Sequence, residues 1–122
     1  MKPIRWVGGS EKDLDAMPAD VRRDIRAALV VAQGGARSTT VRRMQGSLRD
    51  AMEIVAHGRD GTFRGIYYVG KELIYGLHFF QKKSKRAIST PKRELDLIRS
   101  RLASARRDER KGGPGDDVRN DG

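Results

Sequence analysis

Three runs of β-branched and aromatic residues, at positions 52–57, 62–69 and 73–80, constrain the fold of this chain more than any other feature. The first two runs are separated by Gly58-Arg59-Asp60-Gly61, and the last two by Gly70-Lys71-Glu72. Short connections of this composition join antiparallel neighbours in β-hairpins. Residues 52–80 are therefore predicted to form a three-stranded antiparallel meander.

The segments on either side of the meander predict elements that can cover it. A short apolar run at residues 4–7 predicts an N-terminal strand, followed by a helical turn from Ser10 and a longer helix from Pro18. The apolar residues of the longer helix recur on one face, at Val21, Ile25, Ala28, Leu29 and Ala32. Thr90 and Pro91 predict the start of a closing helix, whose apolar stripe comprises Leu95, Ile98, Leu102 and Ala105. Residues 36–50, which are rich in arginine, are predicted to be a basic loop.

This order of elements predicts an α+β fold. A small antiparallel sheet, made of the N-terminal strand and the three-stranded meander, would carry two N-terminal helices on one face, together with a C-terminal helix. The other face of the sheet is expected to be free for function. One domain is predicted for residues 1–106. Residues 107–122 are predicted to be a disordered polar tail, because they cannot bury enough apolar surface to become ordered.

The chain is strongly basic, with 26 Lys and Arg against 16 Asp and Glu and a net charge of +10. Residues 107–122 hold four basic and five acidic residues, so the positive excess belongs to residues 1–106. An excess of this size in a small protein indicates a polyanionic partner, because Lys and Arg attract phosphates and release their counterions. A nucleic acid is the partner expected from the charge.

Several classes of protein lack support in the sequence. The absence of cysteine excludes disulfides, thiolate metal sites and cysteine nucleophiles, and with two histidines neither a metal site nor another cofactor is expected. Glycine-rich phosphate loops, GxSxG and HExxH motifs are also missing from the sequence. No apolar run approaches the roughly 18 residues of a membrane-spanning helix. Without a secretory segment either, a cytoplasmic location away from membranes is expected.

Side-chain alternation in the first hairpin predicts a polar face on the sheet. Whether the turn has two or four residues, Glu53 and His57 share a face with Arg64 and Tyr68. The opposite, core side holds Met52, Ile54, Ala56, Phe63, Gly65, Tyr67 and Val69. The face of His78 stays open, because a one-residue difference in the second turn reverses it.

The residue types on the polar face suit one reaction in particular. Metal-free RNA cleavage needs a base for the 2′-hydroxyl proton, cations for the phosphorane and an acid for the leaving oxygen. Arginine, lysine, histidine and tyrosine can fill these roles. Each of them can equally be an ordinary surface residue of a strand, so composition and spacing leave both interpretations open.

Four stretches of the sequence are similar to one known family. They are residues 48–50, 62–68 and 90–94 and, most specifically, His78-Phe79-Phe80-Gln81-Lys82-Lys83-Ser84-Lys85. Together with Met17-Pro18 and the following helix, they make residues 3–106 resemble the phage-related HigB-like branch of the RelE/ParE toxin superfamily. The resemblance implies a type II toxin that cuts mRNA in the ribosomal A site and thereby inhibits translation. It also implies an antitoxin encoded alongside, often of the helix-turn-helix type.

The resemblance assigns roles to residues of this chain. Arg64 and Lys83 would stabilise the transition-state charge, and Lys82 and Lys85 would hold the RNA backbone. RelE itself has lysines on the strand that occupies residues 52–57 here, so the base is open, with His57 as a substitute. Further residues expected at the site are Tyr68 among the catalytic groups and Arg42, Arg43 and Arg86 among the RNA contacts.

Two other functions remain open at this point. A ParE-like inhibitor of DNA gyrase would share the fold without needing a catalytic set. A phage-derived protein that binds nucleic acid without cutting it would also explain the charge. The cluster after Phe80 favours the ribonuclease, because a basic face suited to RNA has no use on gyrase. The oligomeric state is open as well.

Overall fold

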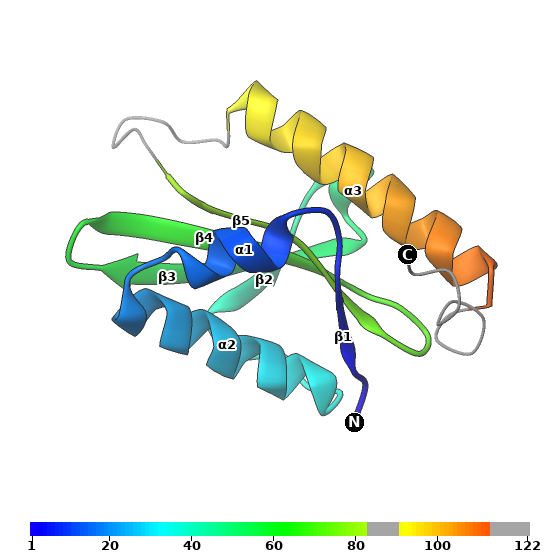
Figure 1. The fold of residues 1–122 in the computed structure, drawn as a ribbon, viewed down its shortest axis with the longest axis horizontal. Coiled ribbons are helices and arrows are strands. Elements are labelled where there is room, and N and C mark those ends of the chain that lie inside the picture. Colours follow the sequence, from blue (N-terminus) through cyan, green and yellow to red (C-terminus); the bar gives the residue numbers. More distant parts are fainter. Residues whose placement is uncertain (83–90, 113–122) are drawn as a thin grey trace.

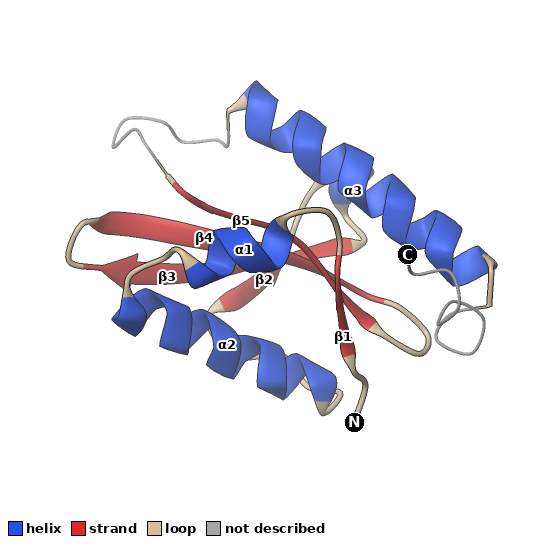
Figure 2. Ribbon diagram, viewed as in Figure 1, coloured by secondary structure: helices blue, strands red, loops and turns tan. Residues whose placement is uncertain are grey.

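The structure, a computed structural model, describes residues 1–82 and 91–112. Its elements in chain order are β1 (Ile4–Trp6), α1 (Ser10–Asp15), α2 (Ala19–Gln33), β2 (Val41–Arg43), the 3-10 turn η1 (Gly46–Leu48), β3 (Ala51–Gly58), β4 (Gly61–Val69), β5 (Ile74–Gln81) and α3 (Lys92–Arg110). The strands form one sheet in the order β1-β5-β4-β3-β2 (Figures 1 and 2). The predicted α+β class and the antiparallel meander are confirmed.

The sheet is larger and more mixed than predicted. β1 pairs with β5 in the parallel orientation, so the sheet is not purely antiparallel. Residues 41–43, expected in a basic loop, form the edge strand β2 and pair antiparallel with β3. Three residues are too few to show a strand pattern in the sequence. Pairing with the long strand β3 is what makes them a strand.

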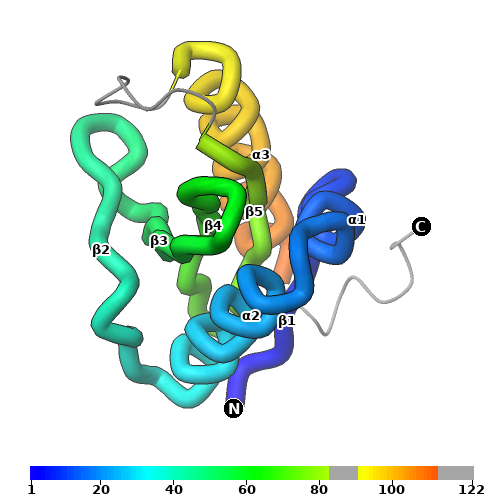
Figure 3. Tube along the Cα trace, turned by 90° about the vertical axis from the view of Figure 1, so that its left-hand side faces the viewer, coloured from blue at the N-terminus to red at the C-terminus, as the bar shows by residue number. Residues whose placement is uncertain are grey.

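Two hydrophobic clusters hold the sheet between its helices. Residues from α1 and α2, such as Leu14, Ile25 and Leu29, pack with Ile54, Phe63 and Tyr67 on one face. The α3 residues Ile98, Leu102 and Ala105 pack on the other face, against Ala51, Ile66, Tyr75 and Leu77. Figure 3 shows the sheet with α1 and α2 on one side and α3 on the other. The expectation of a free second face was therefore wrong, since the apolar stripe of α3 covers much of it.

A β-bulge determines the face of His78. Tyr67 pairs with Gly76 and Ile66 with His78, so that Leu77 has no direct partner on β4. Because directly opposed residues point to the same side of a sheet, His78 lies on the face of Ile66, under α3. Gly76 is required on the other side of this strand, because a Cβ there would lie 2.6 Å from the ring of Trp6.

The closing helix ends later than predicted. α3 runs to Arg110, so residues 107–110, expected in the polar tail, are helical. Two acids of its last turn bind the sheet: Tyr75 donates a hydrogen bond to Asp108 at 2.7 Å, and Tyr68 donates one to Glu109 at 2.6 Å. Arg5 of β1 adds an ion pair to Asp108 at 2.8 Å. These contacts order a turn whose composition alone looks unstructured, while residues 113–122 lie outside the described part.

None of the helices in residues 1–82 and 91–112 combines the length and the apolar content that are needed to cross a membrane.

Candidate functional site

A pocket of about 600 Å³ on the α3 side of the sheet gathers four arginines. β3 and β4 form its floor, and β2, η1 and the first half of α3 form its walls. Its charged residues are Arg42, Arg43, Glu53, Arg64 and Arg99. We call this pocket the arginine groove. Glu53 is the one acid among the described residues that line it, so the groove attracts anions.

A buried ion pair lies on the floor of the groove. Glu53 is 4% exposed and Arg64 is 9% exposed. The Nη1 atom of Arg64 donates a hydrogen bond to Oε2 of Glu53 at 2.6 Å, and Nε of Arg42 donates one to Oε1 at 2.9 Å. The Nε atom of Arg64 is buried without a hydrogen-bond partner in the described part of the chain. One N–H of this guanidinium is thus unused.

The register of the sheet creates this arrangement. Arg42 is directly opposite Glu53 on the neighbouring strand, and Arg64 is opposite Val55, one diagonal step from Glu53. Side chains at such positions face the same side and lie close enough to interact. The predicted placement of Glu53 and Arg64 on one face is therefore confirmed, and the unpredicted strand β2 brings Arg42 to the same carboxylate.

The structure does not bring His57 to the groove. This residue lies at the end of β3 beside the first hairpin turn, and its Nδ1 atom is 3.3 Å from the hydroxyl of Thr62. It lines a separate hollow against α2, together with Asp24 and Val31. It shares a sheet face with Arg64, as expected, but lines a different pocket.

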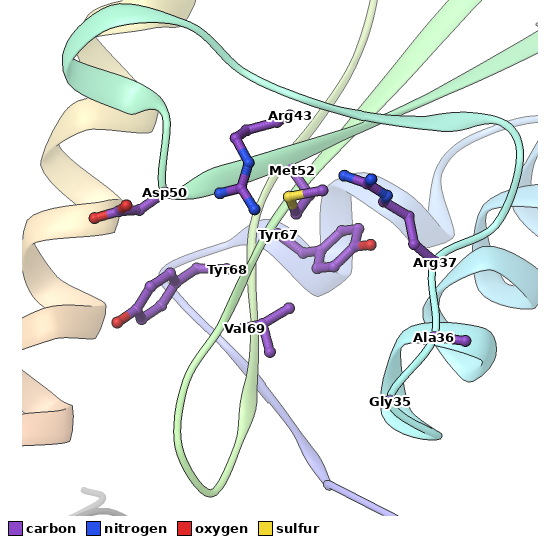
Figure 4. A pocket seen from close by; sticks show the side chains of 9 residues that line it. All are labelled: Gly35, Ala36, Arg37, Arg43, Asp50, Met52, Tyr67, Tyr68 and Val69. Carbon is purple, nitrogen blue, oxygen red and sulfur yellow. The ribbon is translucent and has the colours of Figure 1, made fainter.

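Tyr68 is also separated from Arg64. The two positions are four residue steps apart on β4, which corresponds to roughly 13 Å along a strand. The hydroxyl of Tyr68 donates to Glu109 at the end of α3, and its ring lines another pocket, shown in Figure 4. Burial, followed by the hydrogen bond and the charge of Glu109, raises the pKa of Tyr68 to about 12. At neutral pH this hydroxyl is therefore protonated and bound to Glu109.

The raised pKa predicts a loss of stability in alkali. The unfolded chain releases the Tyr68 proton near the ordinary pKa of 10.0, whereas the folded chain keeps it to about pH 12. Folding is therefore favoured fully below pH 10 and less as the pH rises through this window. Tyr75 is shifted in the same direction by its burial and by Asp108. Urea unfolding between pH 9 and 12 is expected to show a steeper loss for the native chain than for Tyr68→Phe with Tyr75→Phe. Parallel curves would contradict this.

The basic residues expected after the last strand are only partly described. Lys82 directly follows β5, and its backbone N–H donates to the carbonyl of Thr62 at 2.8 Å. Lys83, Lys85 and Arg86 lie outside the described residues. Arg42 and Arg43, expected as RNA contacts, both line the arginine groove.

Sequence reasoning missed two features near the groove. Arg99 was not singled out, although it follows Leu95 by four residues and so had to lie on the face of the apolar stripe. The second is a buried pair under the start of α3: Nε2 of His78 is 2.7 Å from Oε1 of Glu94, and its ring stacks on Phe80. The other ring nitrogen is buried without a hydrogen-bond partner in residues 1–82 and 91–112.

The same described ranges contain no group of three or more histidines and acids placed to hold a metal ion.

Comparisons with known proteins give one family. The model of the family described as "Phage derived protein Gp49-like (DUF891)" matches residues 12–103. Among solved structures, the chain is similar to the toxin–antitoxin complex RelBE2 from Mycobacterium tuberculosis, with 18% identity, a TM-score of 0.43 and coverage of 68% of this chain and 93% of that chain. No curated protein matches the sequence. The family match covers α2, the meander and the arginine groove, together with parts of α1 and α3, and it confirms the resemblance to phage-related toxins. The chain thus belongs to the phage-derived Gp49-like family, a family of RelE-like toxins.

Proposed function

We propose that this protein is the toxin of a type II toxin–antitoxin system, a ribosome-dependent endoribonuclease that cuts mRNA in the arginine groove. The observation that carries the proposal is the buried Arg64–Glu53 pair at the floor of a groove lined by three further arginines. Guanidinium groups match the geometry of phosphate oxygens and stay charged at any physiological pH. A groove of this kind suits a phosphodiester backbone.

The groove supplies most of what metal-free cleavage needs. Attack of a 2′-hydroxyl on the neighbouring phosphate builds negative charge on the phosphorane oxygens. Arg64 is held for this role, since Glu53 fixes one of its nitrogens at 2.6 Å while its Nε has no partner among the described residues. Arg42, 65% exposed in its side chain, is placed to bind the same or an adjacent phosphate. Charge stabilisation by fixed donors is commonly the largest single contribution to such a reaction.

The proton acceptor we propose is Glu53 in place of His57. Glu53 is the groove's one carboxylate in the described part, whereas His57 lines a different hollow. A carboxylate beside two guanidinium groups can take the 2′-hydroxyl proton as the phosphorane forms between them. The lysines on the corresponding RelE strand would then have a carboxylate counterpart here. We propose that the proton donor to the leaving oxygen comes from the basic segment 82–86. Lys83 stays a proposed group for the transition-state charge, and Lys82, Lys85 and Arg86 stay proposed RNA contacts.

The partners follow from the proposed activity. The substrate is mRNA on the ribosome, which places the protein in the cytoplasm. The HigB-like character that we propose would imply an antitoxin encoded by an adjacent reading frame. The net charge of +10 suits both the RNA and an acidic antitoxin.

The experiment that tests the proposal is induced expression in a bacterial host, with primer-extension mapping of a reporter mRNA. Growth arrest with cuts that require translation of the reporter supports the ribonuclease. Growth arrest without cuts would indicate a gyrase inhibitor instead, and the absence of arrest would indicate a nucleic-acid binder without activity.

The affinity of the arginine groove for RNA can be tested separately from cleavage. Replacing Arg42 and Arg99 by alanine together is expected to weaken the affinity for a single-stranded RNA oligonucleotide and to reduce its salt dependence by about two counterions. The matched control is Arg23→Ala with Lys12→Ala, which removes two exposed cations outside the groove. An equal loss in the control pair would show that the net charge, and not the groove, binds RNA.

A further inference from the structure

A second pocket, of about 580 Å³, lies at the edge of the sheet where the chain passes from α2 toward β2. Its floor contains Met52 and Tyr67, and Val69 lies at its rim. Arg37 and Arg43 extend over the floor from opposite sides, as Figure 4 shows. We call this the Arg37 pocket. The proposed function makes no use of its floor or of Arg37.

The two cations of the pocket lack carboxylate partners in the described part of the chain. Arg43 donates to the backbone carbonyl of Arg49 at 2.9 Å. Burial raises the pKa of Tyr67, and the nearby charge of Arg37 acts in the opposite direction. The acid of the pocket, Asp50, is already paired with Arg106 of α3. The pocket therefore presents two guanidinium groups that can accept an external anion.

An exposed apolar side chain lies at the rim of the Arg37 pocket. Val69, predicted to face the core, is 44% exposed at the rim of the pocket. Val30 and Val31, 52% and 39% exposed, lie on α2 and do not line this pocket; Val31 lines the separate hollow that contains His57. Apart from Met1, these are the exposed large hydrophobic residues of the described ranges. Val69 adds an exposed apolar side chain to a pocket whose floor of Met52 and Tyr67 is flanked by two cations without carboxylate partners in the described part of the chain.

We infer that the Arg37 pocket binds a segment of the antitoxin that carries carboxylates beside apolar side chains. This inference rests on the proposed function, because the antitoxin is the partner proposed there. Carboxylates would pair with Arg37 and Arg43, and apolar side chains would cover Val69 and the floor of Met52 and Tyr67. An RNA backbone would satisfy the two arginines but would leave Val69 exposed and the floor of Met52 and Tyr67 uncovered, so the pocket favours a protein over a nucleic acid.

The placement of Arg43 connects this pocket to the arginine groove. Arg43 lines both pockets. A carboxylate bound to Arg43 in the Arg37 pocket would remove one cation from the RNA site. An antitoxin docked here would therefore weaken RNA binding without having to fill the whole groove.

The test uses the protein encoded by the adjacent reading frame, co-expressed with the full chain and purified as a complex. Arg37→Glu and Val69→Asp are each expected to weaken the affinity at least about tenfold, because they add repulsion to an acidic partner or remove an apolar contact. Growth arrest by these two variants is expected to persist. The matched control Arg23→Glu makes the same charge change on an exposed position of α2 outside the pocket and should bind normally.

Hydrogen exchange identifies the docking surface directly. Slower exchange of the amides at residues 35–43 and 67–69 in the complex supports the inference. Protection confined to other surfaces, unchanged affinity of both pocket variants, or the absence of a complex with the native chain would overturn it. So would an equal loss of RNA affinity in Arg37→Glu and Arg99→Glu, since the pocket would then belong to the RNA. The proposed cleavage activity is scored separately, on the free toxin, so a failure of one proposal is distinct from a failure of the other.

Discussion

Replacing Arg64 by alanine is expected to reduce mRNA cleavage by about 100-fold to 1000-fold, the usual loss when one fixed donor to a developing negative charge is removed. The same change leaves the buried Glu53 with Arg42 as its remaining ion-pair partner, and Arg42 is largely exposed. Breaking a buried ion pair from one side costs about 3 kcal/mol of unfolding free energy. Primer extension measures the cleavage, and urea unfolding measures the stability.

Two further variants separate the chemistry of Arg64 from its part in folding. Glu53→Leu with Arg64→Met removes both buried charges, and apolar residues of similar volume often replace such a pair at little cost. Stability is therefore expected to recover in this double variant while cleavage stays lost. Arg64→Lys keeps the positive charge but loses the planar guanidinium group, and it is expected to retain only a small part of the cleavage activity. Native cleavage rates in the double variant would remove the arginine groove from the mechanism.

Truncating Ile98 to alanine is expected to lower the unfolding free energy by about 3 kcal/mol, within the usual range for deleting a buried aliphatic side chain. Ile98 is 0% exposed and belongs to the cluster that joins α3 to the sheet. The loss combines the lost burial with the cavity left behind. Because α3 forms a wall of the arginine groove, the variant is also expected to lose RNA affinity near its unfolding midpoint.

The control for Ile98 is its neighbour Leu97. Leu97 is only partly buried and belongs to neither hydrophobic cluster, so Leu97→Ala is expected to cost less than about 1 kcal/mol. Equal losses in the two variants, measured by urea unfolding, would mean that α3 contributes to stability through helix propensity and not through its packing on the sheet.

The candidate site shows which relations between residues local sequence patterns can predict. Glu53 and Arg64 could be placed on one face because alternation along two strands and a short turn decide that relation. The same reasoning grouped His57 and Tyr68 with them, but a shared face does not imply a shared pocket. Tyr68 lies about four residues along β4 from Arg64, roughly 13 Å away along an extended strand.

The sequence by itself determined the helices, the meander and which residues of its first hairpin share a face, because periodicity and turn composition act between residues close in the chain. Only the tertiary structure decided that α3 covers the second face, that β1 runs parallel to β5 and that a bulge turns His78 toward α3. It also decided that Arg42 joins Arg64 on one carboxylate. Each of these depends on which distant segments pack together, and that choice is made by the burial of the whole core.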